Sequence, residues 1–210
     1  MQKGNLSEIA ESIKKCQRCD LYKTATHAVP GEGNPQAAVV FIGEAPGFHE
    51  DREGRPFVGN AGKYLDMLLL KAGLRREDVF ITNVVKHRPP ENRDPAPQEI
   101  AACSVWLEEQ LAAISPKVVV TLGRWSLARY APKSKISDVH GTPFKTGGVV
   151  VLPMYHPAAA LRSSQTERQL TEDFLKNKDL LQNPKTADQI TETFEKKGQS
   201  RLSDGQGSLF

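Results

Sequence analysis

The sequence has no long uninterrupted apolar run, and its mean hydropathy of -0.45 excludes a membrane-spanning protein. Residues 1–15, MQKGNLSEIAESIKK, lack the apolar segment of a secretory signal, so we expect a cytoplasmic location. The sequence has little excess charge of either sign, because 28 Lys and Arg against 25 Asp and Glu leave a net charge of only +3. That value permits nucleic-acid binding without indicating it. The odd count of 3 cysteines argues against a disulfide framework and favours metal or reactive-thiol chemistry.

The 210 residues suit one domain with appendages, since domains average roughly 150 residues. We expect a folded domain over 1–182 and a polar extension over 183–210. One short helix is predicted in this extension, over 187–196. The GQSRLSDGQGSLF segment has too little apolar surface to fold by itself.

Four short apolar runs rich in β-branched residues predict strands that are covered on both faces, as in a parallel sheet. These runs are 37–43, 79–83, 117–123 and 149–155. Between them, apolar residues at helical spacing predict helices over 60–72 and 97–114. The alternation predicts an α/β domain with a largely parallel sheet, whose ligands bind beyond the carboxyl ends of the strands.

Three cysteines and one histidine form a candidate metal site. Cys16 and Cys19 make a C-x-x-C pair, and Cys103 lies on the predicted helix over 97–114. Three thiolates leave a four-coordinate site one ligand short, and His87 is the best-placed residue to complete it. Such a set suits zinc or an iron–sulfur cluster, and the spacing does not decide between them. An exposed loop histidine and a buried core thiol are the alternative interpretation.

Polar residues follow three of the predicted strands. Glu44 lies in the turn GEAPG after the first strand, Asn83 ends the second, and His156 follows the fourth. Because parallel strands end at the same edge of a sheet, these residues predict a polar pocket. Phe57, in GRPFVG, offers a ring that could stack on a flat ligand, although a core anchor fits the same position.

The chain resembles the family 4 (iron–sulfur) uracil-DNA glycosylases over roughly residues 10 to 165. The resemblance rests on GEAPGFHEDREGRPFVGNAGKYL, ITNVVKHRPPENRDP, IAAC, PKVVVTLG and MYHPAAALR. It implies a single-domain α/β fold of the uracil-DNA glycosylase type, with a central four-stranded parallel sheet flanked by helices. It also implies a monofunctional hydrolase of base excision repair that cuts the N-glycosidic bond of uracil in DNA.

A [4Fe–4S] cluster is the cofactor that this resemblance implies, with zinc as the alternative. Cys16, Cys19 and Cys103 match three ligand positions of the family, and His87 stands where the fourth cysteine would be. Histidine replaces cysteine at iron in other clusters. A related branch that traps its product covalently also has this histidine, with an Arg-rich insertion that ENRDPAPQEIAA lacks. We therefore expect turnover.

The resemblance also implies roles for the pocket residues. His156 would donate a hydrogen bond to uracil O2, and backbone N–H groups around Ala45 would be further donors. Asn83 would accept a hydrogen bond from uracil N3–H and donate one to O4. Phe57 would stack on the extruded base.

The attacking water needs a carboxylate to position it, and several residues are candidates. Glu44 is the first choice and Glu50 the second. His49 and Asp51, which flank Glu50, stay open as further candidates.

Contacts with single- and double-stranded DNA are expected from the segment after the fourth strand. Leu161 could enter the gap left by the extruded base, while Arg162 meets a phosphate. Further candidates for contact with the DNA backbone are Arg55, Lys86, Arg88 and Arg93. Charged loops of this kind are often simply solvated.

The C-terminal QGSLF resembles the pentapeptide that docks on bacterial sliding clamps, with Gln206, Leu209 and Phe210 as its anchors. We expect a monomer associated with the nucleoid. The alternative function is a non-catalytic nucleic-acid-binding module stabilised by an iron–sulfur cluster or zinc.

Overall fold

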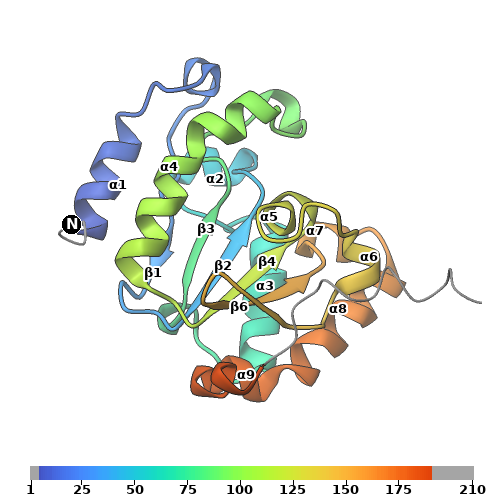
Figure 1. The fold of residues 1–210 in the computed structure, drawn as a ribbon. Coiled ribbons are helices and arrows are strands. Elements are labelled where there is room, and N and C mark those ends of the chain that lie inside the picture. Colours follow the sequence, from blue (N-terminus) through green and yellow to red (C-terminus); the bar gives the residue numbers. More distant parts are fainter. Residues whose placement is uncertain (1–4, 191–210) are drawn as a thin grey trace, which may run out of the picture.

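A computed structural model describes residues 5–190, in which a central β-sheet lies between two layers of helices (Figure 1). The strands are β1 (Glu32–Gly33), β2 (Val39–Gly43), β3 (Phe80–Asn83), β4 (Val118–Leu122), β5 (Phe144–Thr146) and β6 (Val149–Met154). The helices are α1 (Leu6–Lys14), α2 (Phe48–Glu53), α3 (Asn60–Lys71), α4 (Pro97–Ile114), α5 (Arg124–Ala128), α6 (Ile136–Val139), α7 (Pro157–Ala160), α8 (Ser164–Lys176) and α9 (Lys178–Gln182). Single 3₁₀ segments are η1 (Asp20–Lys23), η2 (Arg76–Asp78), η3 (Pro90–Asn92) and η4 (Pro184–Gln189).

The strand order is β1-β3-β2-β4-β6-β5, and the four central strands are parallel. This confirms the predicted four-stranded parallel sheet and adds two antiparallel edge strands that the sequence did not predict. β1 has 2 residues and β5 has 3, too few to show a hydrophobic pattern. β1 also depends on a close approach, because a side chain at Gly33 would overlap the carbonyl of Val79.

Alternate residues of the central strands enter two different apolar layers, one on each face of the sheet. Phe41 and Val120 face α3, α8 and α9, whereas Ile42 and Val119 face α4. Helix α1 packs on the outer side of α4 (Figure 1). Coverage on both faces explains why the strands read as continuous apolar runs.

The predicted helices over 60–72 and 97–114 agree with α3 and α4 to within one residue. Helix α4 begins where the sequence predicts, because Pro97 needs no backbone hydrogen bond in the first turn and Glu99 accepts from the backbone N–H of Ala96. Since the parallel strands end at one edge, the loops after β2, β3, β4 and β6 meet there. That edge carries the polar residues of interest.

Some of the predicted features lie wholly or partly outside residues 5–190. The helix predicted over 187–196 overlaps η4 at its start, and its remaining part lies outside residues 5–190. The clamp-binding residues Gln206, Leu209 and Phe210 also lie outside them, and the boundary at 182 stays a prediction. Among the described residues, no helix is long and apolar enough to cross a membrane.

Candidate active site

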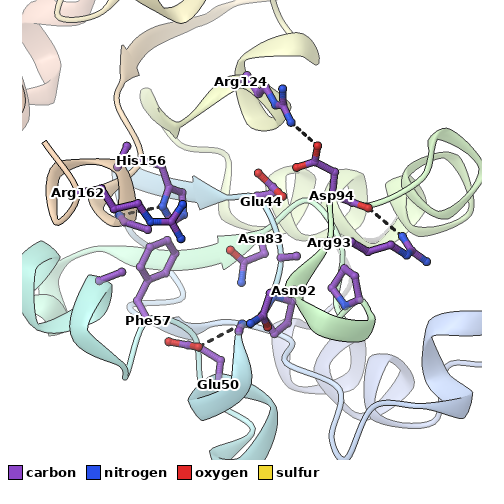
Figure 2. A pocket seen from close by; sticks show the side chains of 17 residues that line it. Glu44, Glu50, Phe57, Asn83, Asn92, Arg93, Asp94, Arg124, His156 and Arg162 are labelled. Atoms are coloured by element: carbon purple, nitrogen blue, oxygen red, sulfur yellow. Dashed lines mark hydrogen bonds and ion pairs between the residues drawn. The ribbon is translucent and has the colours of Figure 1, made fainter. Parts of the chain in front are cut away.

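A cavity of about 620 Å³ opens at the carboxyl ends of the parallel strands (Figure 2). Every residue that the sequence placed in the catalytic and substrate-binding set lies on its wall. These residues are Glu44, Ala45, Glu50, Phe57, Asn83 and His156. Arg162 also lines the cavity, on the side of α7 and α8. The prediction of a shared pocket at the strand ends is therefore confirmed.

Asn83 is the last residue of β3 and is 1% exposed. Its side-chain oxygen Oδ1 is buried and has no hydrogen-bond partner among the described residues. β2 leaves room for this amide with Gly43, which pairs with Asn83 in the sheet. A side chain at Gly43 would overlap Asn83 Oδ1 and come within 2.6 Å of the Phe57 ring. An unpaired buried oxygen that faces a cavity can accept a hydrogen bond from a ligand bound there.

His156 caps the amino end of α7, and this contact determines which ring nitrogen carries the proton. Its Nδ1 accepts a hydrogen bond from the backbone N–H of Ala158 at 3.1 Å. A neutral imidazole then has its proton on Nε2, which is left as a donor. Burial is the main reason that the pKa of His156 is lowered to about 4, with the charge of Glu50 opposing the shift and that of Arg162 adding to it. At neutral pH the ring is therefore an uncharged hydrogen-bond donor.

The Phe57 ring lies beside the His156 ring and near Asn83 on the cavity wall (Figure 2). Its centroid is 5.6 Å from that of the His156 ring, with 29° between the two planes. The residue is 5% exposed and packs into the core on the α3 side, as a core anchor would, and its stacking on a ligand stays a prediction. Its φ of 52° is in the left-handed region, which is strained for a bulky side chain.

Three contacts hold the backbone around Phe57 in this strained shape. Gly62 presents its Cα to the Phe57 carbonyl, where any side chain would overlap it. The guanidinium of Arg76 donates to the carbonyl of Pro56. On the other side, Glu50 Oε1 accepts from the backbone N–H groups that follow Phe57. Sequence reasoning did not find the roles of Gly62 and Arg76, because both are contacts between separate segments.

Glu50 is committed to backbone hydrogen bonds. Its Oε1 accepts from Val58 N at 2.9 Å and from Gly59 N at 3.0 Å, and its Oε2 accepts from Gly47 N at 3.1 Å. The carboxylate thus joins the start of α2 to the loop that carries Phe57. Its part in activating water stays a prediction, and these contacts give it a structural task.

Glu44 has a different environment on the same wall. Within residues 5–190, no group donates a hydrogen bond to its carboxylate. Burial, with a smaller contribution from the charge of Asp94, raises the pKa of Glu44 to about 7 against the opposing charge of Arg124. Asp94 and Arg124 form an ion pair across the cavity mouth that the sequence did not predict (Figure 2). A carboxyl group with a pKa near the working pH suits general-base chemistry.

Lys86 corrects one of our predictions. The sequence placed it among the possible DNA contacts, but it is 0% exposed and cannot reach a phosphate, so that prediction is wrong. Its ammonium donates to the Asn83 carbonyl at 2.8 Å, to Thr82 Oγ1 at 2.7 Å and to Gln110 Oε1 at 2.7 Å. Lys86 therefore ties the end of β3 to α4 and fixes the backbone of Asn83.

The other predicted DNA contacts differ in their surroundings. Arg55 does not line the cavity, and it forms an ion pair with Glu32, which also binds Arg76. Leu161 is 52% exposed beside Arg162 at the cavity rim, a position that suits contact with DNA. The DNA-binding roles of the five remaining candidates stay predictions, namely those of Arg55, Arg88, Arg93, Leu161 and Arg162.

The candidate metal ligands lie where the N-terminal segment meets α4. Cys16 and Cys19 are close enough to Cys103 for their charges to raise its pKa, which burial brings to about 11. His87 is buried. The backbone N–H of Lys86, the residue before it, donates to the Cys103 sulfur. Trp106 Nε1 lies 3.1 Å from the sulfur of Cys16 as a further donor.

Within residues 5–190, no group of three or more His, Cys, Asp or Glu side chains is arranged to hold a metal ion. The residue types alone fit an iron–sulfur cluster, whose iron atoms are bound by cysteine thiolates and in some clusters by histidine. Neighbouring thiols that receive N–H···S hydrogen bonds fit such a cluster.

Comparison with known proteins agrees with this geometry. The model of the uracil DNA glycosylase superfamily matches residues 30–178. The chain is 50% identical over 188 residues to a type-4 uracil-DNA glycosylase of Saccharolobus solfataricus, covering 84% of this chain and 87% of that protein. It is 46% identical over 178 residues to the type-4 enzyme of Thermotoga maritima, covering 82% and 93%. A type-5 uracil-DNA glycosylase of Thermus thermophilus is 36% identical over 168 residues, covering 70% and 75%.

Replacing Glu44 by Gln should stabilise the fold at pH 8. Because the folded-state pKa lies above the unfolded value of 4.5, the penalty of ionising this carboxyl group grows as the pH rises from about 4.5 to about 7 and is complete above that. A neutral amide removes that penalty. We expect a gain on the order of 1 kcal/mol, allowing for solvent screening. Thermal unfolding of the variant and the unchanged chain at pH 5 and pH 8 tests this, and an equal difference at both pH values contradicts it.

Replacing Glu50 by Gln should have the opposite effect. The amide keeps one acceptor oxygen but turns an NH₂ group toward a backbone N–H donor, leaving it unpaired. We expect a loss of about 2 kcal/mol in the free energy of unfolding. The same unfolding measurement at pH 8 checks it, with Glu44→Gln as the matched variant. Stability equal to that of the unchanged chain would show that the three hydrogen bonds contribute nothing.

Proposed function

This chain belongs to the uracil DNA glycosylase superfamily, and from that premise we propose that it is a monofunctional uracil-DNA glycosylase of base excision repair. It hydrolyses the N-glycosidic bond of uracil in DNA and leaves an abasic site. The observation that carries this proposal is the buried, unpartnered oxygen of Asn83 in the same cavity as the neutral His156. No observation favours the alternative of a non-catalytic binding module.

Asn83 selects the base. Uracil has a donor at N3–H and an acceptor at O4, which the acceptor and donor of one amide can match together. Cytosine has an acceptor at N3 and a donor amino group at C4, so it would set like groups of the amide and the base against each other. Each mismatched buried group costs about 1–3 kcal/mol. Phe57 supplies the flat apolar surface on which the base stacks.

His156 stabilises the departing base. Breaking the bond places negative charge on uracil and positive charge on the sugar. Because Nδ1 is already engaged by Ala158, the free Nε2–H would donate to uracil O2 as that charge develops. With a pKa of about 4 the ring acts through this hydrogen bond and does not transfer a proton at pH 7. Backbone N–H groups around Ala45 would add to the stabilisation.

Glu44 positions the attacking water on the sugar. Its carboxylate is free of protein donors within residues 5–190, so its oxygens can accept from a water molecule. As an anion, it also offsets the positive charge on the sugar. Glu50, whose oxygens accept from three backbone N–H groups, would hold the Phe57 loop in place instead.

We infer that Cys16, Cys19, Cys103 and His87 would hold a [4Fe–4S] cluster. When bound, the cluster would act as a crosslink between the N-terminal segment, the loop after β3 and α4. These residues lie next to Lys86, which fixes the backbone of Asn83. The cluster ligands therefore support the base-binding wall from behind and take no part in bond cleavage.

The substrate is uracil-containing DNA, which we propose the enzyme accepts as a single strand or a duplex. A duplex base must be extruded to reach the cavity, at a cost of a few kcal/mol. Leu161 and Arg162, on the rim next to His156, would fill the gap and contact a phosphate. The chain would act as a monomer, with its C-terminal pentapeptide as a docking peptide for a sliding clamp.

An oligonucleotide with one uracil tests the reaction directly. Alkali-labile cleavage at that position is expected for the unchanged chain, and oligonucleotides with thymine or cytosine there serve as controls. His156→Ala should lower kcat by about 10² to 10³, because one charge-stabilising donor is lost. Asn83→Ala should reduce the preference for uracil over cytosine. If the unchanged chain produces no abasic site, the proposed activity is refuted.

The reaction should also depend on pH through Glu44. We expect kcat/KM on the single-stranded substrate to rise as the pH increases through about 7, because the carboxyl group acts when ionised. His156 is neutral throughout this range and adds no second inflection. Glu44→Gln should lower kcat by about 10² to 10⁴ and remove the rise. A variant that keeps the same pH profile would assign the water to another group.

His87→Ala tests the cluster through its colour. The unchanged chain should be brown, with broad visible absorption, and the variant should lose absorbance and iron per chain. His87→Cys should retain both, since cysteine is the usual ligand. A colourless chain that contains zinc would contradict the cluster. Unchanged iron content in His87→Ala would remove His87 from the ligand set.

A further inference from the structure

Phe48 is a large apolar side chain that is 47% exposed, next in sequence to a residue of the cavity wall. It begins α2, and the preceding residue, Gly47, lines the cavity wall. Other exposed large apolar side chains of the described residues are Leu70 on α3, Leu161 after α7 and Leu175 on α8. Nothing in the proposed excision step uses Phe48.

Two arginines converge on the Phe48 ring. The guanidinium carbon of Arg52, one turn further along α2, is 5.6 Å from the ring centroid. That of Arg88, from the loop after β3, is 5.2 Å away. Arg88 precedes Pro89, which lines the cavity, so the ring and both cations lie just outside the opening. We call Phe48, Arg52 and Arg88 the rim platform.

The rim platform differs from neighbouring arginines in having no anionic partner. Arg93 is paired with Glu99, Arg124 with Asp94 and Arg55 with Glu32. Within residues 5–190, neither Arg52 nor Arg88 forms an ion pair, and the partner of Arg88 Nε is the neutral amide oxygen of Asn92 at 2.7 Å. Two like charges on one ring repel each other, and a bound anion would remove that repulsion.

The chemistry of the rim platform matches an unpaired nucleotide. Aromatic rings and guanidinium planes both stack on bases, and guanidinium groups bind phosphate oxygens with paired hydrogen bonds. Resting on the excision of uracil proposed above, we propose that the rim platform binds the nucleotide next to the extruded uridine in single-stranded DNA. Its base stacks on Phe48 and its phosphate lies between Arg52 and Arg88.

Single-stranded DNA is the occupant because of the stacking surface. In a duplex, the neighbouring base is already stacked and paired, so the rim platform offers it little. An unpaired base has a free face and gains the full contact. The rim platform therefore gives the enzyme a preference for uracil in unpaired DNA, whereas Leu161 and Arg162 serve the duplex on the opposite side of the cavity.

Phe48→Ala in the full chain is the central experiment. Binding to a uracil-free single-stranded oligonucleotide is measured by fluorescence anisotropy, so no chemistry enters. We expect Kd to rise about tenfold for the single strand and less than twofold for a duplex of the same sequence. With uracil present, the loss should reside in KM for the single strand. Leu70→Ala, which removes a more exposed side chain from α3, is the matched control and should change neither value.

Two further variants separate stacking from a structural role. Phe48→Trp should restore single-strand binding, because it keeps an aromatic face. Arg88→Gln should lower the slope of log K against log salt concentration by about 0.7, the value for one phosphate contact on a single strand. Inhibition by free uracil should be equal in all variants, since the base pocket is untouched.

Several results would overturn the proposal. These are an unchanged single-strand Kd in Phe48→Ala, an equal loss on single strand and duplex, or a loss that Phe48→Trp does not restore. A failure of the proposed function looks different. If the unchanged chain excises no uracil from either substrate, the glycosylase assignment fails even where uracil-free DNA binds.

Discussion

The rest of the site depends on one constraint. The side-chain oxygen of Asn83 must stay buried and unpaired, so the fold must prevent this side chain from moving to a position where the oxygen would find a partner. A buried acceptor without a partner costs about 1–3 kcal/mol, so the fold has to hold it in place. The sheet does this through the register of Asn83 with Gly43, and Lys86 does it by binding the Asn83 carbonyl. In the proposed function, a rigid amide with an unpaired oxygen would let hydrogen bonding discriminate between uracil and cytosine, because a mobile amide could adapt to cytosine.

The two carboxylates of the cavity also differ in which hydrogen-bond donors the fold provides for them. Glu44 and Glu50 are six positions apart in the sequence and line one wall, yet their surroundings give them different tasks. Glu50 receives three backbone N–H groups, which keep the strained Phe57 loop closed. Glu44 receives none from residues 5–190, and burial brings its pKa to about 7. In the proposed function, this difference in environment, more than residue type, makes Glu50 the structural acid and Glu44 the reactive one.

The sequence predicts much of this fold because its signals are local. The four parallel strands, α3, α4 and the polar residues at the strand ends can be read from apolar runs, Pro97 and motifs such as GEAPG. What it does not show depends on contacts between distant segments. β1 depends on the close approach of the Gly33 backbone to the carbonyl of Val79. Lys86 is buried because Gln110 and Thr82 supply hydrogen-bond acceptors for its amino group. No pattern within KHRPPENRDP distinguishes a buried lysine from a solvated one.

The surface arginines also show that contacts between distant segments cannot be predicted from the sequence. A net charge of +3 is small, and the sequence treats each loop arginine alike. The structure divides them, because carboxylates already neutralise Arg55, Arg93 and Arg124. A guanidinium held by a carboxylate must give up that partner before it binds a phosphate, so its contribution to DNA affinity is reduced. Within residues 5–190, Arg52, Arg88 and Arg162 form no such ion pair, so in the proposed function they would contribute most to binding a nucleic-acid backbone. A strand bound by them would cross the cavity that contains Asn83.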